Sequence, residues 1–76
     1  MESVFQKRLR ERRLEVGMSM PDLQFAYNGK RYRTFIFKLE HGIRRPGLDV
    51  VERLAKCLTC SPCWLAGWSN TKEATR

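Results

Sequence analysis

Residues 30–42, KRYRTFIFKLEHG, combine charged, hydrogen-bonding and apolar side chains at helical spacing. Ile36 and Leu39 lie three positions apart, and Tyr32 and Phe35 join them on an apolar face. The residues left on the other face are Arg31, Arg33, Thr34 and Lys38. Guanidinium, ammonium and hydroxyl groups are donors that proteins use against phosphates and base edges. The segment therefore predicts a short helix whose cationic front suits a DNA groove, ended by the glycine that closes the segment.

Composition bounds what the chain can bind. Its 76 residues contain 15 Lys and Arg against 8 Asp and Glu, a formal net charge of +7. Such an excess predicts a polyanionic partner, although the sign alone does not separate DNA, RNA and an acidic membrane surface. The apolar runs are too short for a transmembrane helix, and no secretory signal is recognised. We therefore expect a cytoplasmic protein with no membrane partner.

Three cysteines are spaced as Cys57-x2-Cys60-x2-Cys63, which resembles part of an iron–sulfur binding run. A fourth ligand is missing, because the other candidate, His41, lies far off in the sequence. An odd number of cysteines without a signal peptide favours reduced thiols, so we expect no metal and no cofactor. Clustered carboxylates, a glycine-rich phosphate loop and a Ser/His/Asp set are also missing from the sequence. We expect neither an enzyme nor a small-molecule substrate.

Capping residues place the other helices. Ser3 with Gln6, and Ser19 with Asp22, are capping-box patterns that predict helix starts. Ser61 before a proline predicts the start of a last short helix. The predicted helices span residues 3–16, 20–28, 31–40, 48–58 and 62–67. The expected fold class is all-α, with five helices.

Helical spacing also predicts which side chains face the core. In the second helix we expect Leu23, Ala26 and Tyr27 to point inward. In the fourth helix the expected inward set is Leu48, Val51, Leu54, Ala55 and Leu58. In the last helix we expect Trp64 and Leu65 to point back at the core. These sets predict one core shared by all the helices.

The apolar stripe of the first helix contains one charge. Phe5, Leu9 and Val16 recur at helical spacing. Arg13 falls on the same stripe and requires a partner, because an unpaired buried charge is costly. The opposite face carries Lys7, Arg8, Arg10 and Arg12. This basic run is either a solvated surface or a set of phosphate contacts, and the sequence favours neither.

Two segments, KLEHGIRRP and LAKCLTCSPCWLAG, follow one another within this five-helix pattern. Together they resemble the helix-turn-helix DNA-binding domain of the phage repressor and Cro-like family, also called Xre-type or lambda repressor-like. The resemblance covers about residues 5–67 and implies a bundle whose second and third helices form the helix-turn-helix. It implies a DNA-binding domain at residues 1–68, and residues 69–76 are expected to form a flexible C-terminal tail.

The resemblance also implies roles for individual residues. The helix at about residues 31–40 would enter the major groove of DNA. The residues implied to read bases are Arg33, Thr34, Phe37 and Lys38. Phosphate contacts, or else solvated charges, are expected at Lys30, Arg31, Arg44, Arg45 and Arg10. An ion pair is implied between Arg13 and Glu40, and a dimer interface around Trp64 and Trp68.

These roles imply a sequence-specific transcriptional regulator of phage or prophage repressor or Cro type, or of antitoxin type. One domain reads one half-site of double-stranded DNA, so we expect a homodimer on half-sites about 34–36 Å apart. The chain departs from the family in being about two residues longer between Ser19 and Glu40, either in the second helix or in the turn. That surplus and an exposed Phe37 support an alternative, a protein-binding adaptor that kept the fold without operator recognition. RNA binding is a third hypothesis, with no aromatic sheet to favour it.

Overall fold

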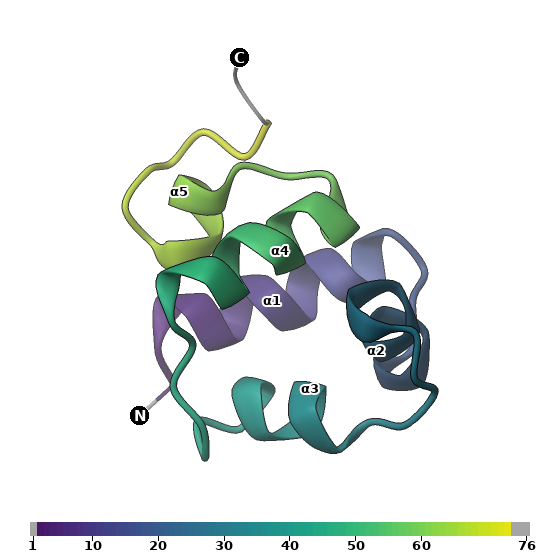
Figure 1. Cartoon of the computed structure of the whole chain (residues 1–76). Helices are drawn as coiled ribbons and strands as arrows, with labels where there is room; N and C mark the ends of the chain where they lie inside the picture. Colours follow the sequence, from purple (N-terminus) through teal and green to yellow (C-terminus); the bar gives the residue numbers. More distant parts are fainter. Residues whose placement is uncertain (1, 74–76) are drawn as a thin grey trace.

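Five helices and their connections make up residues 2–73, the part of the chain that the computed structural model describes (Figure 1). Their bounds are α1 Val4–Glu15, α2 Met20–Asn28, α3 Thr34–Glu40, α4 Leu48–Leu58 and α5 Pro62–Ala66. Residues 2–73 contain no strand, so the prediction of an all-α fold is confirmed. Within the same residues, none of the helices is both long and apolar enough to cross a bilayer.

The helix starts follow from contacts between residues three positions apart. The Ser3 side chain accepts a hydrogen bond from the Gln6 backbone N–H, and the Gln6 side chain accepts one from the Ser3 N–H. The same reciprocal pair links Ser19 and Asp22 at the start of α2. Ser61 caps α5 through the backbone N–H of the residue three positions on. All three predicted caps are confirmed, because such motifs depend on local sequence alone.

The glycine after α3 is favoured by its backbone conformation, and it lies close to a side chain of α1. Gly42 has φ of +72°, a left-handed conformation that residues with a Cβ rarely adopt. A Cβ at this position would also lie 2.9 Å from Nε2 of Gln6. The same Nε2 donates a hydrogen bond to the backbone oxygen of Glu40, at 3.2 Å. The turn after α3 is therefore packed directly against the start of α1.

Every helix contributes to a single core. Helix α1 packs against α3 and α5, helix α2 packs against α3 and α4, and α4 packs against α5. Figure 1 shows α3 on one side of the bundle and α5 on the opposite side. The large apolar side chains that are almost completely buried are Leu9, Leu23, Ile36, Leu39, Leu54, Leu58 and Leu65. This core holds α3 by one face only.

The third helix is shorter than predicted. It begins at Thr34, whereas the spacing predicted a helix over residues 31–40. Residues 29–33 form a connection instead, and Tyr32 is 44% exposed rather than on the inward face. The chain leaves α2 at Gly29 in a left-handed conformation, with φ of +77°, and residues 30–33 lead from there to α3. Within this connection the Arg31 side chain contacts an acidic residue of α2, Asp22, at 2.7 Å.

Three further side chains differ from the inward faces predicted for their helices. Ala26 is exposed and Gln24 is fully buried instead, because the inward stripe of α2 passes through position 24. Leu48 is 64% exposed, since it is the first residue of α4 and stands at the edge of the stripe. The first helix ends at Glu15, which leaves Val16 outside it and exposed.

The described part of the C-terminal tail is attached to the bundle, whereas we predicted a flexible segment from residue 69. The backbone N–H of Ser61 donates to the Lys72 oxygen at 2.8 Å. Lys72 Nζ also lies 3.1 Å from both carboxylate oxygens of Glu15 on α1. The last three positions of the predicted tail, residues 74–76, lie outside the described residues.

Candidate nucleic-acid interface

The orientation of α3 depends on a buried ion pair. Arg13 Nε lies 2.6 Å from Glu40 Oε2, and Arg13 Nη2 lies 3.2 Å from Glu40 Oε1. Arg13 Nη1 also donates to the Met18 backbone oxygen at 3.0 Å. Both side chains are buried, so the charge on the stripe of α1 has the partner it required. The pair joins α1 to the last residue of α3.

Two other arginines of α1 bind backbone oxygens at helix ends. Arg12 Nε donates to the oxygen of Leu58, the last residue of α4, at 2.9 Å. Arg8 Nη1 donates to the oxygens of Trp64 in α5 and Ser69 beyond it, at 2.6 and 2.7 Å. Cations are favoured at the C-terminal ends of helices, where backbone oxygens lack partners. Arg8 and Arg12 are thus structural residues of the bundle, which is neither of the two roles expected for the basic run of α1.

Arg10, predicted as a phosphate contact, has a carboxylate partner. Its guanidinium forms a two-point contact with the Glu2 carboxylate. The hydrogen bond from Arg10 lowers the pKa of Glu2, and it is the largest cause of that shift. Because Glu2 already holds Arg10, a phosphate would have to compete for the same donors.

The four predicted base readers lie around the solvent side of α3. Arg33, Thr34 and Lys38 are exposed, and Phe37 is half-buried. Positions 34, 37, 38 and 41 are spaced as one helix face. The Phe37 ring is partly covered by its neighbours, with the His41 ring at 4.1 Å between centroids and the Arg33 guanidinium at 5.6 Å. This face offers hydrogen-bond donors and one aromatic ring to an external partner.

Cations also lie on the connections before and after α3. Lys30 in the first connection and Arg44 and Arg45 in the second are exposed. Arg44 is held over the Phe35 ring at 5.2 Å. Within residues 30–45 the only carboxylate belongs to Glu40, which is buried and already paired. The surface formed by residues 30–45 is therefore strongly positive.

Arg31 contacts two residues of α2 for which the sequence predicted no such contact. It lies 2.7 Å from an Asp22 carboxylate oxygen, and its guanidinium is 5.3 Å from the centroid of the Phe25 ring. The Arg31 hydrogen bond, followed by the bonds from Ser19, lowers the pKa of Asp22 to about 2. Asp22 was predicted only as a capping residue, and no local pattern signals its partner nine positions later. Arg31 thus fixes the connection as well as adding charge.

The two tryptophans differ in exposure. Trp64 is 7% exposed and belongs to the core, with the Arg8 guanidinium and the Lys72 ammonium over its ring at 4.9 and 5.5 Å. Trp68 is 69% exposed. The predicted dimer interface around both residues is therefore available through Trp68 and not through Trp64. Trp68 borders a hollow of about 400 Å³ whose other lining residues are Phe5, Pro46, Gly47, Leu48, Val51 and Ala66.

The cysteines do not assemble into a ligand set in the described structure. Cys57 is half-buried, Cys60 is buried and Cys63 is exposed. Burial raises the pKa of the thiols of Cys57 and Cys60, which favours the protonated form. Residues 2–73 contain no group of three His, Cys, Asp or Glu side chains that could hold a metal ion.

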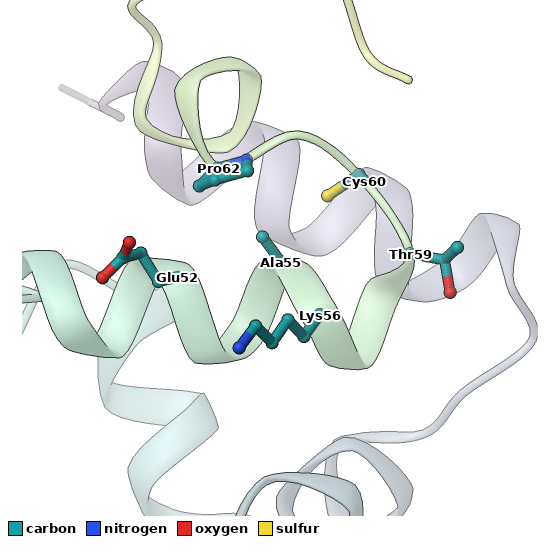
Figure 2. Close-up of a pocket in the computed structure, with 6 residues that line it drawn as sticks. All are labelled: Glu52, Ala55, Lys56, Thr59, Cys60 and Pro62. Atoms are coloured by element: carbon teal, nitrogen blue, oxygen red, sulfur yellow. The ribbon is translucent and has the colours of Figure 1, made fainter. Parts of the chain in front are cut away.

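A second hollow, of about 360 Å³, lies between α4 and the connection to α5 (Figure 2). Figure 2 shows the sulfur of Cys60 pointing toward Ala55, with Glu52 and Lys56 on the α4 side. None of the predicted DNA-contacting residues lines it. The hollow is separate from the positive surface around α3.

No protein-family model, curated protein or solved structure matches the chain.

Proposed function

We propose that this chain is a double-stranded DNA-binding protein in which α2 and α3 form a helix-turn-helix and α3 enters the major groove. Within that class we propose a sequence-specific transcriptional regulator of phage repressor or Cro type, or of antitoxin type. The observation that carries the proposal is the exposed side of α3, which presents hydrogen-bond donors and is surrounded by cations. The one carboxylate of residues 30–45, that of Glu40, is buried and paired. The resemblance of residues 5–67 to that family adds to it.

The dimensions of α3 suit this role. An α-helix with its side chains is about 10–12 Å across and fits a major groove about 12 Å wide, and the seven residues of α3 give about two turns to lie along it. The buried Arg13–Glu40 pair fixes the end of α3 that leads back into the bundle. The connection before α3 has five residues, 29–33, where helix-turn-helix motifs usually have about three or four. We assign the surplus length of the chain to this wider turn.

Roles follow from exposure and chemistry. Arg33 is the proposed guanine reader, because its fork matches O6 and N7. Thr34 and Lys38 add donors to the same face, and Phe37 would contact thymine methyl groups. Lys30, Arg44 and Arg45 are the proposed phosphate contacts. Arg31 and Arg10 contribute less, because each first has to leave a carboxylate.

Selection of bound sequences from a pool of random duplexes tests the proposal, combined with a salt titration of the affinity for the selected duplex. We expect a defined half-site and an affinity that falls steeply as salt rises, because bound phosphates release counterions. A chain that enriches no sequence, or that fails to bind duplex DNA at low salt, is not an operator-binding regulator.

A homodimer on DNA is part of the proposal. Val4, Leu48 and Trp68 are large apolar residues that are 51%, 64% and 69% exposed, and Leu48 and Trp68 line the same hollow. Exposed apolar surface of this kind is typical of an association site. Sedimentation on a duplex with two half-sites about 34–36 Å apart should give two protomers per duplex. A single bound protomer would rule the homodimer out.

A protein-binding adaptor is the second candidate, favoured by Phe25, which is 52% exposed on α2. Aromatic side chains are enriched in protein–protein interfaces. The salt titration separates the two functions. An adaptor would not bind random duplex DNA even at low salt, whereas a DNA-binding protein with this charge would.

A further inference from the structure

An exposed aromatic ring of α2 lies beside the arginine at the start of the following connection, and a second exposed aromatic residue comes directly after that arginine in the chain. Phe25 is 52% exposed and Tyr32 is 44% exposed, and the Arg31 guanidinium lies 5.3 Å from the centroid of the Phe25 ring. We call these three residues the aromatic–arginine patch. The connection that holds Arg31 and Tyr32 leads directly into α3, and Figure 1 shows it on the same side of the molecule as α3.

The core does not explain the exposure of the patch. The inward stripe of α2 is already made by Met20, Leu23, Gln24 and Tyr27. Phe25 is 52% exposed, and the guanidinium of Arg31 lies over its ring. Tyr32 is 44% exposed and lies in a segment with no helical structure. Large apolar groups left in water next to a charge are typical of a binding surface.

The chemistry of the patch matches an unpaired nucleobase. In a duplex the bases are stacked on one another and present only their edges in the grooves. The flat face of an aromatic side chain finds a partner in a base that has left the stack, and guanidinium groups add to such stacking. Charge points to the same occupant, because Lys30 and Arg33 flank the patch and Asp22 is neutralised by Arg31.

We infer that the aromatic–arginine patch stacks on unpaired bases next to the duplex held by α3, so that the chain prefers DNA with a locally opened strand. The inference rests on the proposed DNA-binding function and narrows the ligand from duplex DNA in general to duplex DNA with a locally opened strand. A protein partner is the competing occupant. The positive flanks favour a polyanion over a protein surface of mixed charge.

The test compares three fluorescent probes of identical sequence with the full chain at one salt concentration. The probes are a paired duplex of about two helical turns, the same duplex with a short central bubble, and the single strand. We expect the bubble to bind about tenfold tighter than the paired duplex. This is the size of effect that one aromatic side chain stacked on one base has in proteins that bind single strands. Phe25→Ala and Tyr32→Ala should each reduce that preference and leave the affinity for paired duplex unchanged.

Three variants sharpen the reading. Phe25→Leu keeps apolar bulk but loses the aromatic face, so it should behave like Phe25→Ala. Tyr32→Phe keeps the ring and should behave like the wild type. Trp68→Ala removes an exposed aromatic residue from another part of the surface and should not alter the bubble preference. Circular dichroism checks that each variant is folded. We expect all of them to fold, because the substituted side chains are exposed.

The outcomes separate this inference from the proposed function. Equal binding of bubble and paired duplex by the wild type overturns the inference alone. Unchanged bubble preference in both alanine variants also overturns it, and leaves the patch to a protein partner. Binding of the bubble and the single strand without binding of the paired duplex rejects the operator-binding regulator, and with it stacking next to a duplex held by α3. Failure to bind any probe at low salt rejects both.

Discussion

The cations of α1 and those of residues 30–45 have different surroundings, although their sequences look equally basic. Arg8, Arg12 and Arg13 contact backbone oxygens or a carboxylate inside the bundle. Arg33 and Arg45 are exposed and have no carboxylate partner among the described residues. The first group holds helices together, and the second is available to an external anion.

The comparison teaches that a net charge of +7 does not measure the positive surface offered to a partner. Part of the excess is absorbed where helix C-termini expose backbone oxygens, since those oxygens accept hydrogen bonds from arginine. Substitution in the first group should therefore reduce stability and spare binding. Substitution in the second should do the opposite.

The largest effect is expected at the buried ion pair. Arg13→Ala leaves the Glu40 carboxylate buried without its partner, which should cost about 3–5 kcal/mol of unfolding free energy. Denaturation by urea measures the loss. The double variant Arg13→Met with Glu40→Leu is the control, and should recover much of the stability because no charge is left buried. Equal stability of Arg13→Ala and the wild type would remove Arg13 from the first group.

A smaller loss of stability is expected at the end of α4. Arg12→Ala removes hydrogen bonds from a charged donor to the oxygens of Leu58 and Thr59, which should cost about 1.5–3 kcal/mol. The affinity for duplex DNA should not change, whereas Arg45→Ala should lower the salt slope by about one and keep stability. Weakened DNA binding by a folded Arg12→Ala protein would break the comparison.

Base reading is the next effect in size. Arg33→Ala should lose about 1–3 kcal/mol of discrimination at one guanine of the selected half-site, with stability unchanged within about 0.5 kcal/mol. Arg33→Lys is the matched control, because it keeps the charge but lacks the two-pronged fork. Competition between the selected duplex and one with that guanine replaced measures the discrimination. If both variants prefer the guanine as strongly as the wild type does, Arg33 does not read that base, and it either contacts a phosphate or makes no contact with the DNA.

The smallest effect concerns the Asp22–Arg31 pair and depends on pH. The pKa of Asp22 falls from 3.8 to about 2 on folding, so the pair stabilises the fold fully above the ordinary value. That contribution is lost as pH falls through about 2. The stability difference between the wild type and Asp22→Asn should therefore be small at neutral pH and vanish in strong acid. A difference that grows on acidification would contradict the assigned shift.

Local sequence predicted the bounds of α1, α2, α4 and α5 well, but it placed the start of α3 too early. The starts of α1, α2 and α5 depend on a serine and the third residue after it. Helix α3 has no side-chain cap in the described structure, so no local pattern marked its start. Gln24 is a similar case, since its buried side-chain amide has no hydrogen-bond partner among residues 2–73 and nothing in the sequence favoured its burial over that of Ala26.

The candidate site divides in the same way. Exposure of Arg33, Thr34 and Lys38 follows from helical spacing, because the apolar residues between them occupy the other face. The inward position predicted for Trp64 is confirmed. The cations over its ring could not be derived from spacing, since they come from α1 and from Lys72.

The sequence by itself determined the helix content, the caps, the turn glycines and the apolar stripes, because these depend on residues a few positions apart. Only the tertiary structure decided which arginines became internal supports and which stayed exposed. The partners of Arg12 and Arg8 lie 46 and 56 positions away, at helix ends that meet α1 only when the bundle is assembled.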